Sequence, residues 1–496
     1  MDLIIKNSVA NFYEWESTIA KLNIHVTIGM ESSKIAELIT DNDEEICERL
    51  AIFRDLIEIP ELVELFKKLK ETIDTIFEID EKSKVYSSGL DRTLCDFHMV
   101  EMYVDMVDKI RVLYENIKEK IKSERTKSLF LSFVEFCDSE RYADLKVLIN
   151  DIIRGQGTVK SFSLAINLNQ KLEPYEIGLI GMNDHYFTEK NIYTSFFKSN
   201  KSGFEYAVPL ARYYGGNTVL EKGLYLAANE QLTKLIKKTQ RALIVEMRES
   251  LKSILSQKDD IAFILKAKRY VDSYVDFVCY PEMHNETSIV HAYDPTLNAK
   301  MNIRDIVKND INFNKNGQIY IVTGANSGGK SVYVKTTGIM QIFFQLGLPI
   351  PAKSARIKPV RNIFTHFATS IDNSDSRFVL ECKAMKDILD RIDDNSLLLM
   401  DESFSSTSAF EGEAVARQVL ERLQTVGCKC VFSTHLHELT SMEEANEEGF
   451  AKIENLHVEM RDGFPTYRII KGAADGKSYA YDIAKKYGLE HLKSKK

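Results

Sequence analysis

A glycine-rich segment at residues 324–331 carries the residue types that bind phosphate groups. It reads Gly324-Ala325-Asn326-Ser327-Gly328-Gly329-Lys330-Ser331 and fits the pattern GxxxxGK[ST]. Glycines allow backbone N–H groups to close around phosphate oxygens, and the amino end of a following helix favours an anion. We therefore expect these residues to bind a nucleoside triphosphate, with Lys330 on the β- and γ-phosphates and the Ser331 hydroxyl on Mg²⁺.

Two later segments place acidic and imidazole groups where they could serve the same site. Residues 396–402 form an apolar run that ends in Asp401 and Glu402, and residues 428–434 form a second apolar run that His435 follows directly. We expect Asp401 to bind the metal ion and Glu402 to position or deprotonate the attacking water. His435 would face the γ-phosphate.

These residues need a parallel β-sheet to bring them together, because ligands of open α/β sheets bind at the carboxyl ends of the strands. Residues 318–323 predict a strand before the glycine loop, and the residues from Ser331 onward predict a helix after it. From about residue 281, glycines and prolines become frequent and short apolar runs alternate with helical patterns. The fold class predicted for residues 286–496 is an α/β P-loop ATPase domain, with a mostly parallel sheet flanked by helices.

The first 285 residues show a different pattern. Prolines are rare, and apolar residues recur at helical spacing, most regularly from residue 243 to residue 278. Residues 159–168 and 175–180 instead predict two short strands joined by a polar turn. We predict a mainly α-helical core, lever or clamp-like domain at residues 1–285, with a small β insertion.

Composition limits the possible partners. The 496 residues include 65 basic and 73 acidic side chains, and the net charge of −8 excludes a general nucleic-acid-binding surface, so any such contact must be a local patch. Residues 109–127 and 234–248 gather basic side chains, although both stretches also contain acids. The amino terminus does not resemble a signal peptide, and the seven cysteines lack CxxC spacing, so we expect a cytoplasmic protein with reduced thiols.

The order and the residue sequences of the carboxy-terminal motifs resemble those of the ATPase domain of the MutS mismatch-repair family. The glycine loop has the family's Asn-x-Gly-Gly-Lys-Ser form, and a Gly-Leu-Pro-Ile-Pro-Ala segment follows at residues 347–352. No LSGGQ sequence, the signature of ABC transporters, occurs in the chain. The counterpart in the MutS family is a Ser-x-Phe-x-x-Glu loop, which this chain matches with Ser376, Phe378 and Glu381.

The resemblance implies an ATPase that uses ATP and Mg²⁺ and works as a homodimer. The signature loop would act in trans, with Ser376 reaching the γ-phosphate held by the opposite subunit. Asn326 would help to orient the phosphate or the water. DNA as a partner rests on the resemblance alone, and no membrane contact is implied.

The chain departs from the family in two respects, and one further match has to be weighed. After Glu402, the family's Gly-Arg-Gly-Thr-Ser is replaced by Phe404-Ser-Ser-Thr-Ser, which puts the flexibility of this loop in question. We also expect the mismatch-recognition and connector domains to be missing. Phe12-Tyr13-Glu14 matches the family's Phe-x-Glu wedge, but the following residues look helical and acidic, so we interpret the match as accidental.

Two hypotheses about function follow. In the first, the protein is a DNA-binding ATPase of the MutS type. ATP binding and hydrolysis would switch a dimeric clamp on duplex, branched or damaged DNA, within DNA repair but not as a classical mismatch sensor. In the second, it is an ATP-driven interaction protein that acts on a ribosome or protein assembly without recognising DNA. The net acidity favours the second hypothesis, and the family resemblance favours the first.

Overall fold

The chain divides into two compact units in this computed structural model. The first unit comprises Met1–Val63, Lys120–Lys127 and Asp260–Lys496, and the second comprises Glu64–Glu119 and Ser128–Asp259. This division follows packing, and the boundary near residue 285 that composition suggests stays a prediction. The structure describes residues 3–4, 12–85, 89–153, 161–172, 174–183, 255–274, 276–299, 305–314, 318–367 and 377–473.

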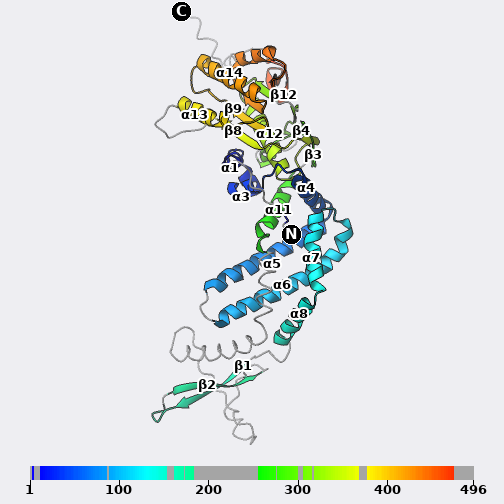
Figure 1. The fold of residues 1–496 in the computed structure, drawn as a ribbon, viewed down its shortest axis with the longest axis vertical. Coiled ribbons are helices and arrows are strands. Elements are labelled where there is room, and N and C mark those ends of the chain that lie inside the picture. The colour runs from blue at the N-terminus through cyan, green and yellow to red at the C-terminus, as the bar shows by residue number, and fades with distance from the viewer. Residues whose placement is uncertain are drawn as a thin grey trace, which may run out of the picture. The chain divides into compact units, whose positions relative to one another are not determined.

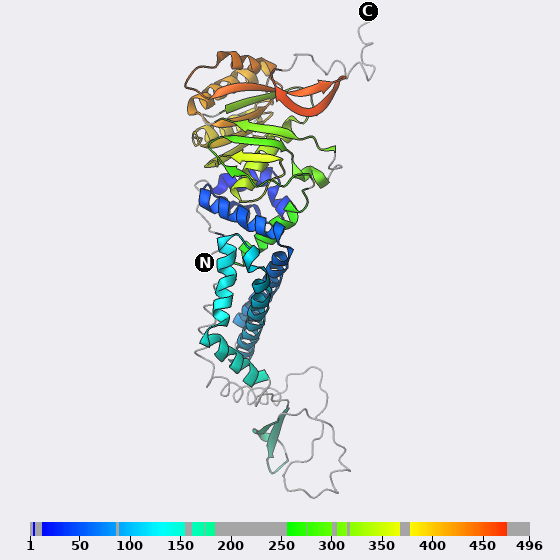
Figure 2. The same cartoon turned by 90° about the vertical axis from the view of Figure 1, so that its right-hand side faces the viewer.

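A six-stranded sheet with the order β12-β11-β6-β10-β9-β8 lies in the first unit (Figure 1). The five strands from β11 to β8 in this order are parallel, and β12 pairs antiparallel with β11 to form a long ribbon (Figure 2). The mostly parallel sheet is therefore present. Its strands are β6 (Gln318–Thr323), β8 (Asn362–Phe367), β9 (Ser396–Asp401), β10 (Lys429–Ser433), β11 (Lys452–Arg461) and β12 (Phe464–Lys471).

Helices cover both faces of this sheet, which explains why its central strands are nearly continuous apolar runs. Leu398 and Met400 of β9 share a buried core with α13 (Arg377–Leu389) and α14 (Ala409–Val426). Leu399, between them, points to the other face and lies against α12 (Lys330–Gln345), which also contacts β10. The helices predicted to flank the sheet are thus on both sides of it.

A second sheet of four strands, in the order β3-β7-β4-β5, belongs to the same unit. β3 and β7 are parallel, whereas β7 with β4 and β4 with β5 are antiparallel. Short 3-10 segments occur at η2 (Pro295–Ala299) and η4 (His437–Ala445). The strands are β3 (Glu282–Met283), β4 (Thr287–Ala292), β5 (Asn309–Phe313) and β7 (Ser354–Ile357).

The amino-terminal helices of the first unit pack against its large sheet. Thr18 Oγ1 donates to the carbonyl of Ile363 in β8 at 3.4 Å, and Glu14 forms an ion pair with Arg391 at 2.5 Å. Glu14 of the Phe-x-Glu match therefore has a packing partner within the first unit. The helices are α1 (Phe12–Lys21), α2 (Ile24–Ile28), α3 (Ser32–Ala36) and α4 (Asp43–Glu58), and most of α11 (Lys258–Val271) also belongs to this unit.

The second unit is mainly helical and contains two strands at the positions where the sequence predicts them. Phe130 joins three helices, since its ring lies 5.4 Å from that of Phe66 and 5.8 Å from that of Tyr114. β1 (Ser161–Leu168) and β2 (Pro174–Asn183) are antiparallel. Within the described part of the chain, no helix is long and apolar enough to cross a membrane. The remaining helices are α5 (Pro60–Val85), α6 (Gly89–Ile117), η1 (Lys118–Lys120), α7 (Glu124–Cys137) and α8 (Glu140–Ile153).

Candidate active site

The glycine loop connects the carboxyl end of β6 to the first turn of α12, in the predicted order. Gly324 has a φ of +122°, and a Cβ there would lie 3.0 Å from the Cβ of Val458. Gly329, the N-cap of α12, has a φ of +94°. Both positions favour glycine, and the N–H groups of the first helical turn are available to an anion.

Lys330 is buried within this loop, with only 5% of its surface exposed. Its ammonium group donates to the carbonyl oxygens of Gly324 at 3.0 Å and Ala325 at 3.1 Å. Burial lowers the pKa of Lys330, and the nearby carboxylates of Glu402 and Asp401 oppose this shift. The loop carbonyl oxygens and the two carboxylates therefore stabilise the positive charge of Lys330 beside the loop.

Asp401 ends β9 and accepts hydrogen bonds from two neighbouring elements. Its Oδ1 accepts from Ser331 Oγ at 2.9 Å and from Ser433 Oγ at 2.6 Å. Because Ser433 is the parallel-strand partner of Asp401, the ends of β9 and β10 meet at one edge of the sheet. The adjacent strand ends explain how Ser331, Asp401 and Ser433, which span 102 positions of the sequence, reach a single site.

The oxygen donors around Asp401 fit a magnesium ion. Mg²⁺ prefers hard oxygen ligands and commonly takes one or two protein carboxylates or hydroxyls, completed by waters and substrate phosphates. Ser331 and Asp401 supply such a pair. Within the described residues, no cluster of three or more His, Cys, Asp or Glu side chains could hold a metal by itself. A site that shares its metal with a phosphate group suits this arrangement.

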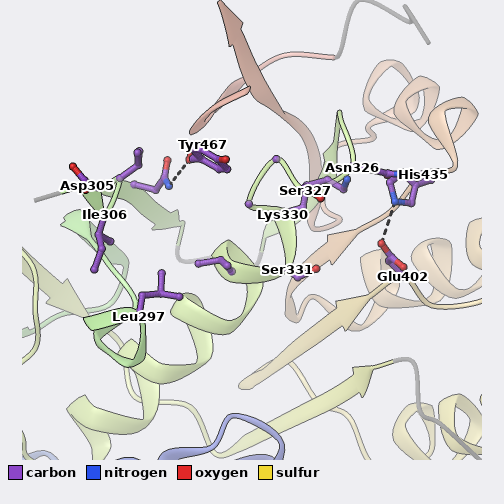
Figure 3. A pocket seen from close by; sticks show the side chains of 15 residues that line it. Leu297, Asp305, Ile306, Asn326, Ser327, Lys330, Ser331, Glu402, His435 and Tyr467 are labelled. Carbon is purple, nitrogen blue, oxygen red and sulfur yellow. Dashed lines mark hydrogen bonds and ion pairs between the residues drawn. The ribbon is translucent and has the colours of Figure 1, made fainter. Parts of the chain in front are cut away.

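Glu402 and His435 face each other at the mouth of the site (Figure 3). Glu402 Oε1 lies 3.0 Å from His435 Nε2, and both side chains are partly exposed. The Glu402 N–H donates to the carbonyl of Ser433 at 2.9 Å, and its φ is +53°. A backbone bond and an imidazole contact thus hold the carboxylate where a water molecule can approach it.

The turn after Glu402 is held by Glu381 of α13. Phe404 has a φ of +63°, which is unfavourable for an aromatic residue, and it stands where the MutS-like pattern has glycine. Its N–H donates to Glu381 Oε2 at 2.9 Å, and its side chain is only 1% exposed. Arg377 Nε lies 3.2 Å from the other carboxylate oxygen of Glu381. The hydrogen bond and the buried ring together stabilise a strained turn.

His366, at the end of β8, forms a second link between this turn and α13. Its Nε2 lies 3.0 Å from the carbonyl oxygen of Glu381, and its Nδ1 lies 2.7 Å from Ser403 Oγ. A carbonyl oxygen only accepts, so we assign the proton of the neutral ring to Nε2; the Ser403 hydroxyl faces Nδ1 and also donates to the carbonyl oxygen of His366 at 3.0 Å. Burial lowers the pKa of His366, which favours this neutral form. Neither His366 nor Ser403 belongs to a recognisable motif, so sequence reasoning missed both.

A cavity of about 700 Å³ opens beside the glycine loop (Figure 3). One wall is polar and carries the loop, Glu402 and His435. The opposite wall includes Leu297, Ile306 and Tyr467, from segments outside the sequence motifs. Phosphates on the polar wall and a base on the apolar wall would fill such a cavity.

The structure brings together most of the predicted site residues, but not all of them are described. Ser376 lies outside the described residues. Phe378 packs on the core of its own chain, and Glu381 is 5% exposed, so both side chains face inward. Their action in trans stays a prediction. Predicted residues that line the cavity are Asn326, Ser327, Gly328, Gly329, Lys330, Ser331, Glu402 and His435.

Comparisons with known proteins identify similar sequences for the part of the chain that carries this site. Residues 320–492 match the family model described as MutS domain V. The DNA mismatch repair protein MutS of Prochlorococcus marinus (strain MIT 9301) is 34% identical over 212 residues, which are 41% of this chain and 23% of that protein. The MutS protein of Bacillus subtilis (strain 168) is 28% identical over 280 residues, covering 53% and 31% respectively.

A relative with a different name is similar to a comparable length of the chain. Endonuclease MutS2 of Streptococcus thermophilus (strain ATCC BAA-491 / LMD-9) is 30% identical over 291 residues, which are 56% of this chain and 36% of that protein. The chain therefore spans about a quarter to a third of the length of these curated relatives.

Proposed function

We propose that this chain, whose residues 320–492 match the model of MutS domain V, is a magnesium-dependent ATPase of the MutS type. One observation carries the proposal. Ser331, Asp401 and the Glu402–His435 pair converge beside a glycine loop at the carboxyl ends of parallel strands. This is the set of groups that phosphate binding, metal binding and water activation require.

In the proposed mechanism, the amides after Gly324 and the ammonium group of Lys330 bind the β- and γ-phosphates. Bound magnesium would offset phosphate charge, and Ser331 and Asp401 would hold it. Glu402 accepts the proton of the attacking water, and His435 orients the Glu402 carboxylate. The buried lysine and the helix amino terminus stabilise the negative charge that builds up on the phosphates.

We further propose that the active form is a homodimer in which ATP controls the grip on DNA. Ser376 would reach the γ-phosphate of the opposite subunit, while Glu381 positions the Phe404 turn within its own subunit. The names of the relatives, a DNA mismatch repair protein and an endonuclease, support DNA as the partner. Since Glu14 is engaged by Arg391, the Phe-x-Glu match offers no support for mismatch sensing.

Replacing Glu402 with Gln tests the proposed chemistry. We expect Glu402→Gln to retain ATP binding and to lose at least about 100-fold in turnover, because the amide cannot accept the water proton. Phosphate release and fluorescent-nucleotide binding would be measured on the purified full chain with magnesium. Glu421→Gln, an exposed change on α14, is the matched control and should retain native turnover. Native turnover in Glu402→Gln would refute the role of the base.

The competing hypothesis, an ATP-driven protein that acts on a ribosome or protein assembly, makes a different prediction for the same variant. The ATP-trapped Glu402→Gln protein should retain its partner. Filter binding to homoduplex, mismatched and four-way DNA, with and without ATP, separates the two. ATP-dependent DNA retention supports the DNA clamp. Absence of DNA binding, together with co-purification of ribosomes or a protein complex, supports the alternative.

A further inference from the structure

The basic stretch at residues 109–127 is already neutralised by carboxylates in the described structure. Six of its seven basic side chains form ion pairs with acids of the same unit. A basic side chain whose charge is offset by a neighbouring carboxylate attracts phosphate less strongly than a basic side chain without such a neighbour. The stretch at residues 234–248 lies outside the described residues. The pairs are Lys109–Asp105, Arg111–Asp138, Lys118–Glu115, Lys122–Glu58, Arg125–Glu45 and Lys127–Glu124.

Three other cations, far apart in the sequence, line a single pocket of about 450 Å³ in the first unit. Arg54 comes from α4, Lys353 precedes β7, and Arg356 lies within β7. All three side chains are exposed, and within the described part of the chain none forms an ion pair with a carboxylate. We call this set the cation pocket. Glu282 is the single carboxylate among its lining residues.

The strand register explains how these groups reach one surface. In β7, Ser354 and Arg356 point to solvent, whereas Ala355 and Ile357 are buried. Arg356 pairs with Ser288 of β4 on one side and with Glu282 of β3 on the other. The polar face of the four-stranded sheet is therefore the floor of the pocket.

Arg54 lies over the ring of Tyr280 at the pocket. Its guanidinium carbon lies 4.7 Å from the centre of the Tyr280 ring. Stacking on a ring leaves the N–H groups at the edge of a guanidinium available for a phosphate oxygen. Lys353 and Arg356 add further N–H donors, and the Ser354 hydroxyl lines the same pocket. The pocket thus offers mainly hydrogen-bond donors and an excess of positive charge.

We propose that the cation pocket binds phosphate groups of a nucleic-acid backbone. A chain with a net charge of −8 requires a local patch for such contact, and these three cations, which have no ion-pair partner among the described residues, form one. Contacts to phosphate carry no base information, so this site would support binding to DNA of any sequence. The inference adds a DNA contact to the proposed function and rests on it for the identity of the partner, but not for the ATP site.

Charge reversal tests the proposal in the full-length protein. We expect Lys353→Glu/Arg356→Glu to weaken binding of a short DNA duplex by at least about tenfold, and to reduce the slope of log affinity against log salt by about 2. Fluorescence anisotropy over a salt titration measures both quantities. Lys109→Glu/Lys118→Glu changes the net charge equally at two exposed, ion-paired lysines and should shift the affinity less than about twofold. Native ATPase turnover in the first variant would show that its fold is intact.

Several outcomes would overturn the inference. Equal losses in both double variants would show that net charge alone matters, and a larger loss in the second would favour the stretch at residues 109–127. Inorganic tripolyphosphate supplies the same chemistry without a backbone. If it binds the wild type but not Lys353→Glu/Arg356→Glu, while duplex affinity is unchanged, the pocket is a site for free anions.

Failure of the inference is distinguishable from failure of the proposed function. A wild-type protein that hydrolyses ATP but binds no duplex overturns the cation pocket as a DNA site and leaves the ATPase assignment intact. A protein that binds duplex through Lys353 and Arg356 but hydrolyses no ATP supports the pocket and refutes the ATPase assignment.

Discussion

Two buried lysines lie at opposite ends of the six-stranded sheet, and their surroundings differ. Lys330 follows the carboxyl end of β6, where two loop carbonyls accept its N–H groups and the carboxylates of Asp401 and Glu402 are near. Lys429 begins β10, at the amino end of the sheet, where its Nζ donates to Thr287 Oγ1 at 3.3 Å. Both lysines are at most 5% exposed.

The surroundings of Lys429 do not compensate its charge. Burial lowers the pKa of Lys429 to about 7, and the positive charge of Lys358 adds to this shift. For Lys330, burial also lowers the pKa, but two carboxylates act in the opposite direction. The difference teaches that burial of a lysine does not by itself identify a functional site. The carbonyl and carboxylate oxygen atoms around Lys330 do indicate a functional site, because they stabilise a positive charge that can bind an anionic ligand.

The largest expected effect comes from removing each lysine in turn. Lys330→Ala should weaken ATP binding by at least about 100-fold, because charge-assisted hydrogen bonds to the phosphates are lost. Lys429→Met should leave ATP affinity within about twofold of the wild type, since its side chain lies at the other end of the sheet. Fluorescent-nucleotide titration measures both. Equal losses of ATP affinity in the two variants would contradict the proposed difference between Lys330 and Lys429.

A smaller effect is expected at Glu381, which supports the turn after Glu402 from outside the proposed ATP site. Glu381 is a buried acid whose carboxylate is engaged by the Phe404 N–H and by Arg377. Glu381→Ala should lower kcat about tenfold while KM for ATP changes less than about twofold, because the Glu402 turn loses its support but the phosphate loop does not. Glu381→Gln keeps an acceptor for the Phe404 N–H and should recover most of the loss.

Steady-state kinetics and urea unfolding would be measured together on both Glu381 variants. A purely structural role would reduce the free energy of unfolding without the split between kcat and KM. An increase in KM with unchanged kcat would instead assign Glu381 to nucleotide binding, and would contradict its role in positioning Glu402.

Sequence reasoning found the catalytic end of the sheet because its residues lie in short contiguous motifs. The glycine loop, Asp401-Glu402 and His435 each follow an apolar strand, and strand order places them together. The link from Glu381 to Phe404 joins residues 23 positions apart through a backbone N–H, which no motif encodes. The replacement of glycine by Phe404 was visible in the sequence, but its left-handed backbone and buried ring were not.

Long-range packing was also beyond the sequence. Helix α1 packs on β8 across 345 positions, and the four-stranded sheet consists of strands too short to recognise by alternation. The cation pocket combines Arg54 with β7, about 300 positions away. Runs of basic residues, by contrast, were easy to see, and at residues 109–127 the structure pairs most of them with acids.

The smallest effect, on stability, comes from the uncompensated lysine. With a folded-state pKa of about 7 against 10.5 for the ordinary group, Lys429 is charged in both states below pH 7. Between about pH 7 and pH 10.5 the unfolded chain binds the extra proton, so the free energy of unfolding should rise with pH across this window. The contribution of this group levels off above it, where the lysine is neutral in both states.

Lys429→Met isolates this contribution. We expect the variant to be more stable than the wild type by about 1 kcal/mol at pH 7, because a methionine fills similar space without a charge to desolvate. Thr287 Oγ1 would still accept from the backbone N–H of Lys358 at 3.3 Å, so no buried hydroxyl loses its last partner. Urea unfolding at pH 7 and pH 9 measures the difference, which should shrink or change sign at the higher pH as the wild-type lysine becomes neutral. A difference that stays constant with pH would show that Lys429 does not titrate in this window, and would remove the electrostatic contrast between the two ends of the sheet.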